Sequence, residues 1–161
     1  MTEIKKERFS GGDFRVHGAR FCLVAARFNE EICNNLVDGA IRTLTEHGIR
    51  ESDIDLVRVP GAFELPLAVQ QIAKAGEYDG IIAVATIIRG GTPHFEFVST
   101  SCTDGLTRIA LDYEVPLGFC VLTTDDVKQA VDRSGDNDEN KGREAALATL
   151  EMVSLLRDMK G

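Results

Sequence analysis

Short runs rich in apolar residues alternate along the chain with longer periodic segments. The apolar runs cover residues 21–25, 55–59, 80–88 and 116–122, and each has the length of a buried strand. Residues 80–88 read GIIAVATII, a continuous run that is typical of a central parallel strand covered on both faces. We therefore expect four strands, with the third at the centre of the sheet.

The periodic segments between these runs predict helices. From residue 30 to about residue 47, apolar residues recur at three-, four- and five-residue steps and form one stripe, which Gly48 then ends. Further helices are expected over residues 64–75, 93–112, 126–133 and 141–159.

Strands separated by helices indicate βαβ units. We predict an α/β fold, a three-layer sandwich with a central parallel four-stranded sheet of the flavodoxin-like kind and helices on both faces. The chain has 161 residues, which fits a single domain over 1–161. Residues 1–14 carry the weakest pattern and are expected to be flexible or to contact a neighbouring subunit.

Composition narrows the classes of function. Hydrophobic residues make up 43% and charged residues 27%, as in a soluble globular protein, and the polar N-terminus lacks a secretory signal, so we expect a cytoplasmic protein away from membranes. The formal net charge of −8 argues against a nucleic-acid partner. An acidic protein that binds a phosphate must use a few local cations and oriented amides.

Motifs for metals and nucleotides are absent from the sequence. The three histidines have no paired metal spacing, and the Walker A, Gly-x-Ser-x-Gly and Gly-x-Gly-x-x-Gly patterns do not occur. The four cysteines, at 22, 33, 102 and 120, form no Cys-x-x-Cys pair, so buried free thiols are favoured over disulfides or metal ligands. We expect neither a metal nor a cofactor.

In open α/β sheets, ligands bind beyond the carboxyl ends of the strands, so the strand-to-helix junctions hold the candidate residues. At the first junction, Phe28 either covers the sheet edge or stacks on a flat heterocycle, and Asn29 is the expected helix N-cap. At the second, Gly61 lets a ligand approach the backbone. Glu64 follows in the first helical turn, where it either stabilises the helix dipole or accepts hydrogen bonds from sugar hydroxyls.

The third junction is the most informative. Gly90 and Gly91 follow the buried strand, Thr92 is the expected N-cap, and Pro93 the expected first helical residue. Amides near Gly91 and Thr92 would form an anion site. The positive end of the helix disfavours a protonated imidazole, so His94 is expected to be neutral and able to accept a proton. A surface histidine at a helix start is the alternative.

The fourth junction carries cations and an acidic loop. Phe119 lies within the strand, where a core position is the default. Arg133 is either a surface charge or the forked donor that a phosphate prefers, and Lys141 follows it. In the loop 135–140, Asp136, Asp138 and Asn140 have the spacing of positions one, three and five of a calcium loop. Position six is then Lys141 instead of glycine, and position twelve is Leu147 instead of glutamate, so we expect a solvated loop.

Taken in order, these junctions resemble those of the 6,7-dimethyl-8-ribityllumazine synthase family over about residues 20–157. The segments that carry the resemblance are Phe28-Asn29, Gly61-Ala-Phe-Glu64, Arg89-Gly-Gly-Thr-Pro-His-Phe95, Gly118-Phe-Cys-Val-Leu-Thr-Thr124, Arg133 and Asn140-Lys-Gly142. The family condenses 5-amino-6-(D-ribitylamino)uracil with 3,4-dihydroxy-2-butanone 4-phosphate and releases phosphate and water, the penultimate step of riboflavin biosynthesis. The resemblance implies a transferase that needs no metal or cofactor.

The resemblance also implies a role for each matched residue. For the pyrimidine substrate, the implied roles are stacking by Phe28, binding of the ribityl chain and ring by Ala62, Phe63 and Glu64, and backbone hydrogen bonds to the ring from Thr86, Ile87 and Ile88. For the phosphate, the implied ligands are Gly91, Thr92 and Arg133, with Lys141 nearby. His94 would be the general base and proton shuttle, and Phe119 would close the pocket from an adjacent subunit.

Members of this family form pentamers with sites shared between subunits, and some assemble pentamers into icosahedral shells. The resemblance therefore implies a homo-oligomer, with riboflavin synthase as a further candidate partner. Two alternatives stay open at this point. One is an enzyme similar to the archaeal riboflavin synthases, which dismutates two lumazine molecules. The other is a non-catalytic flavin-binding or compartment-forming protein.

Overall fold

Four strands form one parallel sheet in the computed structural model, which describes residues 13–161. The strands are β1 (Phe21–Ala26), β2 (Ile54–Val59), β3 (Gly80–Ile88) and β4 (Leu117–Thr124), in the order β2-β1-β3-β4. Strand β3 lies between β1 and β4 and is buried over eight of its nine residues, as its continuous apolar sequence predicts.

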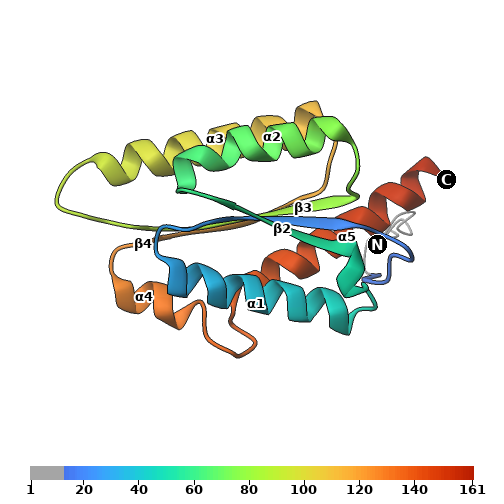
Figure 1. Cartoon of the computed structure of the whole chain (residues 1–161), viewed down its shortest axis with the longest axis horizontal. Helices are drawn as coiled ribbons and strands as arrows, with labels where there is room; N and C mark the ends of the chain where they lie inside the picture. Colours follow the sequence, from blue (N-terminus) through green and yellow to red (C-terminus); the bar gives the residue numbers. More distant parts are fainter. Residues whose placement is uncertain (1–12) are drawn as a thin grey trace, which may run out of the picture.

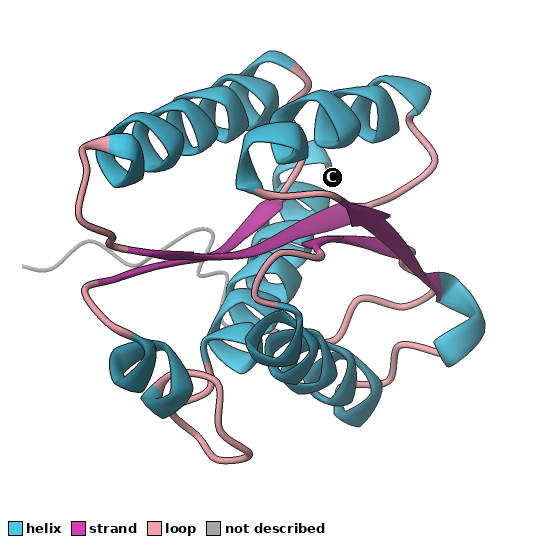
Figure 2. Ribbon diagram, turned by 60° about the vertical axis from the view of Figure 1, so that its left-hand side comes forward, coloured by secondary structure: helices cyan, strands magenta, loops and turns pink. Residues whose placement is uncertain are grey.

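Helices cover both faces of the sheet. The helices are α1 (Glu30–Glu46), α2 (Leu65–Ala75), α3 (His94–Asp112), α4 (Val127–Asp132) and α5 (Lys141–Lys160). Helices α2 and α3 lie on one face, and α1, α4 and α5 lie on the other (Figure 1). Figure 2 shows the same three layers from another side. The prediction of a three-layer α/β fold with a parallel four-stranded sheet is confirmed.

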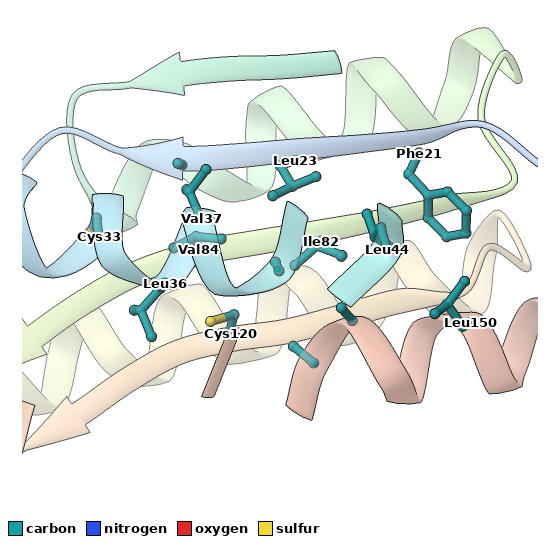
Figure 3. Packing of buried hydrophobic residues seen from close by; sticks show 14 of the residues in the cluster. Phe21, Leu23, Cys33, Leu36, Val37, Leu44, Ile82, Val84, Cys120 and Leu150 are labelled. Atoms are coloured by element: carbon teal, nitrogen blue, oxygen red, sulfur yellow. The ribbon is translucent and has the colours of Figure 1, made fainter. Parts of the chain in front are cut away.

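The core divides along the sheet because neighbouring residues of a strand point to opposite faces. Phe21 and Leu23 of β1 belong to one apolar cluster with Leu36 of α1 and Leu150 of α5 (Figure 3). Cys22 and its neighbours on the same face pack beneath α2 and α3. Each helical layer therefore has its own apolar cluster, and the sheet separates the two.

The cysteines are free and buried, as their spacing predicts. Burial raises the pKa of Cys22 and Cys102 to about 11 and that of Cys120 to about 12, and it also raises the pKa of Cys33. The four side chains therefore stay protonated at neutral pH and act as small apolar groups of the core.

The structure confirms the position of one predicted helix cap and corrects the other. Asn29 is the N-cap residue of α1, as predicted, but it adopts the left-handed conformation (φ 59°, ψ 48°), and its side chain bonds to the carbonyl of Thr86 on β3 instead of to the helix. Helix α3 begins at His94, with Pro93 rather than Thr92 at the N-cap position. The carbonyl of Pro93 accepts hydrogen bonds from the amides of Glu96 and Phe97, so the first turn closes one residue later than expected.

The expectation for residues 1–14 stays a prediction. Residues 1–12 lie outside the described chain, so a flexible or subunit-contacting role for them stays a prediction. Phe14 packs edge-on against His47, with ring centroids 5.6 Å apart. Among residues 13–161, no helix is both long enough and apolar enough to cross a bilayer.

The contact between α1 and α5 generates a test of packing. A Cβ on Gly142 would overlap the backbone carbonyl of Leu36, whereas a Cβ on Gly90 would meet nothing within 4 Å. We expect Gly142→Ala to lower the free energy of unfolding by about 1–3 kcal/mol, since a clash with backbone is relieved only by moving a helix. Gly90→Ala is the matched control, and its free energy of unfolding should stay within about 0.5 kcal/mol of the wild-type value. Urea denaturation at equal protein concentration measures both, and equal stability of the two variants would contradict the packing described.

Candidate active site

One cavity, of about 820 Å³, lies at the carboxyl ends of the strands on the face covered by α2 and α3. We call it the His94 cavity. The candidate residues that line it are Phe28, Ala62, Phe63, Glu64, Thr86, Ile87, Ile88, Thr92 and His94. Three strand-to-helix junctions far apart in the sequence therefore meet around one hollow, as expected for a parallel sheet.

A second cavity, of about 440 Å³, runs along the edge strand β4 and the start of α5, a helix on the face of the sheet opposite α2 and α3. We call it the Arg133 cavity. Phe119, Arg133 and Lys141 line it, and Gly91 lines neither of these two cavities. Within one chain, the structure thus separates Arg133 from Thr92, although both were predicted to hold the same phosphate.

The turn after β1 holds Phe28 away from the core. Its backbone N–H donates to the carbonyl of Pro60 at 3.1 Å, and its side chain is 72% exposed. The amide Nδ2 of Asn29 donates to the carbonyl of Thr86 at 2.8 Å, which ties this turn to the end of β3. The exposure of Phe28 rules out the core alternative and leaves its ring free to stack on a planar ligand.

Sequence reasoning missed the positioning role of Asn29. Asparagine tolerates the left-handed conformation better than most residues, because its short polar side chain forms local or neighbouring hydrogen bonds. That preference is a recognisable signal for a tight turn. The partner on β3 is 57 positions away, however, so the capping rule alone pointed to the wrong bond.

The segment after β2 forms a 3-10 turn, Ala62–Glu64, before α2 begins. Glu64 stands in this turn rather than in the first turn of the α-helix, and Phe63 is 65% exposed at the cavity. The turn therefore directs one carboxylate and one aromatic ring toward the hollow that Phe28 also faces.

The loop after β3 is fastened by Arg89, which sequence reasoning also missed. The Arg89 guanidinium donates to Asp125 at 3.0 Å, pairs with Glu96, and lies over the ring of Phe95 at 4.3 Å. Asp125 and then Glu96 raise the pKa of Arg89, while Arg89 lowers the pKa of Glu96. The ion pairs join the ends of β3 and β4 to the first turn of α3, next to His94.

The glycines of this loop have no structural cause within the described chain. Neither Gly90 nor Gly91 has a positive φ, and a Cβ on either would meet nothing within 4 Å. Close packing and backbone conformation are the usual reasons for a glycine. The space beside both glycines, next to the first turn of α3, is therefore open in the described chain.

The two cations of the Arg133 cavity differ in exposure, since Arg133 is exposed and Lys141 is half-buried. Arg133 follows α4 and donates from Nη1 to the carbonyl of Gln129 at 2.9 Å. Lys141 begins α5 and pairs with Glu144 at 2.8 Å. Among residues 13–161, no group of three or more histidine, cysteine or acidic side chains is arranged to hold a metal ion.

Comparison with known families gives one match. A family model described as 6,7-dimethyl-8-ribityllumazine synthase matches residues 18–157. The match covers most of the chain and includes every junction that lines the two cavities.

The turn at Asn29 generates a prediction about the edge of the His94 cavity. Asn29→Ala should lower the free energy of unfolding by about 1–3 kcal/mol, because it removes a hydrogen bond and makes the left-handed conformation costly. Asn29→Gly restores that conformation without the hydrogen bond, so its loss should be smaller. Chemical denaturation of both variants separates the contribution of the hydrogen bond from that of the left-handed backbone conformation. A glycine variant less stable than the alanine variant would contradict this account.

Proposed function

The chain belongs to the 6,7-dimethyl-8-ribityllumazine synthase family, and from this premise we propose that its two cavities are halves of one active site, supplied by neighbouring copies of the chain. The enzyme is a transferase that condenses 5-amino-6-(D-ribitylamino)uracil with 3,4-dihydroxy-2-butanone 4-phosphate. The products are 6,7-dimethyl-8-ribityllumazine, phosphate and water. None of the observations favours a riboflavin synthase-like or a non-catalytic protein instead.

The separation of the candidate phosphate ligands carries this proposal. Thr92 and His94 belong to one cavity, whereas Arg133 and Lys141 belong to the other, along β4 and α5. A site that needs both groups is incomplete in a single chain. A neighbouring copy that presents its Arg133 cavity to the His94 cavity completes it.

Exposed apolar side chains support such a contact. Phe63 and Phe97 are 65% and 73% exposed at the His94 cavity, and Phe119 and Met152 are 48% and 43% exposed at the Arg133 cavity. Large apolar groups gathered at two separate places favour a protein partner at each. Because the two surfaces differ, the contact is head-to-tail, and a head-to-tail contact that closes produces a ring.

We propose that the ring is a pentamer, and that the shell of pentamers found in some members of the family is its larger assembly. In this proposal residues 1–161 act as one domain of the ring. The four free thiols fit a reducing compartment, so the enzyme is assigned to the cytoplasm.

The His94 cavity is proposed to hold the pyrimidine. Phe28 stacks on the ring, and the turn Ala62–Glu64 binds the ribityl chain, with the Glu64 carboxylate accepting hydrogen bonds from hydroxyls. Within the described chain, β1 pairs with β3 only as far as Val84, whereas β4 continues alongside to Ile88. Beyond Val84, the β1-facing backbone groups of residues 86–88 are therefore beside the cavity, and apart from the Thr86 carbonyl, which accepts from Asn29, a planar ring can use them.

The phosphate is proposed to bind where the two halves meet. Amides of Gly91 and Thr92 at the start of α3 donate to its oxygens, the neighbour's Arg133 supplies a forked donor, and the neighbour's Lys141 adds a second positive charge. Arg89 already pairs with two carboxylates, so it is not the cation assigned to this role. The chain carries a net charge of −8, which makes these local donors necessary.

The chemistry then depends on proton transfer within a site that holds both substrates. The pyrimidine amine attacks the ketone, and water leaves as the imine forms. Phosphate then leaves as a proton is lost from the neighbouring carbon, and tautomerisation gives a second carbonyl. The ribitylamino nitrogen attacks this carbonyl, and the second ring closes with loss of a second water. Each of these steps moves a proton, and His94 is proposed to accept and return it. Holding two substrates in register makes the first step effectively intramolecular. Phe119 of the neighbour covers the site during these steps.

Replacement of His94 tests the assignment of the base. His94→Ala should lower kcat by about 10²–10⁴-fold with the mass of the assembly unchanged, because a positioned general base is lost while the interface remains. Formation of the lumazine product, followed by absorbance or fluorescence, measures the rate, and light scattering measures the assembly. His17→Ala is the matched control, since His17 is exposed and lines neither cavity. Turnover of His94→Ala near the wild-type value would remove His94 from the mechanism.

A further inference from the structure

The loop between α4 and α5 carries both cations of the Arg133 cavity, one at each end. The backbone N–H of Lys141 donates to the carbonyl of Arg133 at 2.9 Å, so the two residues are joined at the base of the loop. This bond fixes the spacing between the two residues. A further contact is needed to hold both of them in place relative to α1 and the sheet.

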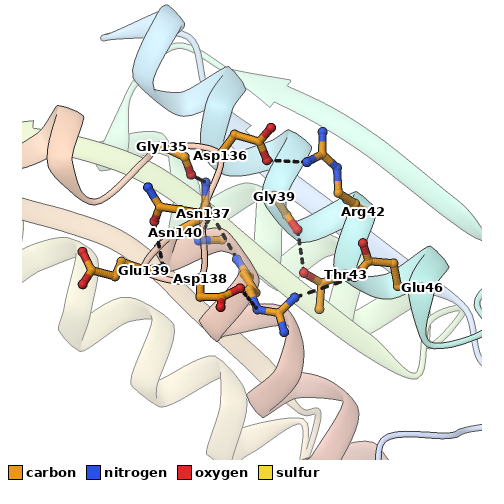
Figure 4. A network of polar contacts seen from close by, with 12 residues as sticks. Gly39, Arg42, Thr43, Glu46, Gly135, Asp136, Asn137, Asp138, Glu139 and Asn140 are labelled. Atoms are coloured by element: carbon orange, nitrogen blue, oxygen red, sulfur yellow. Dashed lines mark hydrogen bonds and ion pairs between the residues drawn. The ribbon is translucent and has the colours of Figure 1, made fainter.

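Asn140 makes that connection from inside the loop (Figure 4). Its Nδ2 donates to the carbonyl of Asn35 on α1 at 3.3 Å and to the carbonyl of Gly135 at 2.9 Å. Its Oδ1 accepts from the amides of Gly142 at 2.8 Å and Arg143 at 3.1 Å, which caps α5. The side chain uses two donors and two acceptors while it is only 4% exposed, so its orientation is fixed by four bonds.

Two glycines make room for this amide. A Cβ on Gly39 of α1 would overlap the side-chain amide of Asn140. A Cβ on Gly142 would overlap the carbonyl of Leu36 and would lie 2.9 Å from Oδ1 of Asn140. Helix α1 therefore approaches the start of α5 closely enough that Asn140 fits in one position.

The ion pairs around the loop are weaker supports. Arg42 pairs with Asp136, and Arg143 lies 3.9 Å from Asp138 and 3.7 Å from Glu46. Most of these side chains are half or more exposed, and ion pairs in such positions contribute little because water screens them. The buried amide is thus the main connection between the loop and α1.

We propose that Asn140 is a positioning residue for phosphate binding. It sets where Arg133 and Lys141 stand relative to α1 and therefore to the neighbouring half of the site, without touching the substrate itself. This inference rests on the proposed function, which assigns those two cations to the phosphate.

Asn140→Asp and Asn140→Ser test the proposal. Both keep a side-chain oxygen that caps α5, and both lose the Nδ2 amide that donates to Asn35 and Gly135, which the single, shorter hydroxyl of serine does not replace. We expect the KM for the phosphorylated substrate, and the inhibition constant of inorganic phosphate, to rise by about tenfold or more as the cations move. The KM for the pyrimidine and the mass of the assembly should stay within error of the wild type. Should the Asp variant fail to fold because a carboxylate then faces two carbonyls, the Ser variant decides.

Two further variants make the outcome specific. Asn137→Ser is the matched control, because Asn137 lies in the same loop, is exposed, and its side chain accepts from the amide of Glu139 within the loop, with no side-chain bond to α1 among residues 13–161. It should leave both KM values unchanged. Arg133→Ala is the reference for lost phosphate binding and should raise the KM for the phosphorylated substrate while pyrimidine binding stays nearly intact.

The results separate the inference from the function on which it rests. If Arg133→Ala raises that KM and the Asn140 variants do not, the positioning role is wrong and the proposed site stands. If the Asn140 variants raise both KM values equally or lower kcat alone, Asn140 is merely structural and the inference is overturned. If Arg133→Ala leaves the KM unchanged, the phosphate assignment itself fails.

Discussion

Parallel pairing of the four strands is the constraint on which the rest of the structure depends. Because all strands run in the same direction, their carboxyl ends meet at one edge of the sheet, and the residues that follow each strand gather there. Phe28, Glu64 and His94 come from three different junctions and line one hollow for this reason. The helices that follow the strands cover both faces of the sheet. The segment after β4 leads to α4, which lies on the face opposite α2 and α3. One chain therefore carries Phe28 and His94 at one cavity and Arg133 and Lys141 at the other.

Charge makes this division matter for function. The chain is acidic overall, and Arg89, the arginine nearest to His94 in sequence, pairs with two carboxylates. An anion at the start of α3 would find backbone amides there, while the less engaged cations, Arg133 and Lys141, belong to the other cavity. A site divided between copies makes catalysis conditional on assembly. In the proposed divided site, the amide of Asn140 matters because it holds Arg133 and Lys141 in place before the two halves meet.

Much of the fold could be predicted from the sequence because burial dictates it. A strand covered on both faces must be apolar throughout, so residues 80–88 identified the centre of the sheet. The lining of the His94 cavity could also be predicted, since the end of a parallel strand is where ligands bind. The errors lie where a local rule competed with a distant partner. Asn29 bonds to Thr86 rather than to its own helix, and the partners of Arg89 are on two other elements. Patterns along the chain carry no signal for such pairings, nor for the separation of Arg133 from Thr92.

The central claim is that each active site takes one half from each of two neighbouring copies. The most direct measurement is the activity of mixed assemblies, made by co-expressing a His94→Ala chain with an Arg133→Glu chain, each inactive alone. Because each site of a ring then draws its halves from two chains, about one quarter of the sites in a random mixture should combine two intact halves. The account predicts that activity returns to about that fraction of the wild-type value. A mixture as inactive as its separate components would show that both groups act within one chain, and would contradict the account.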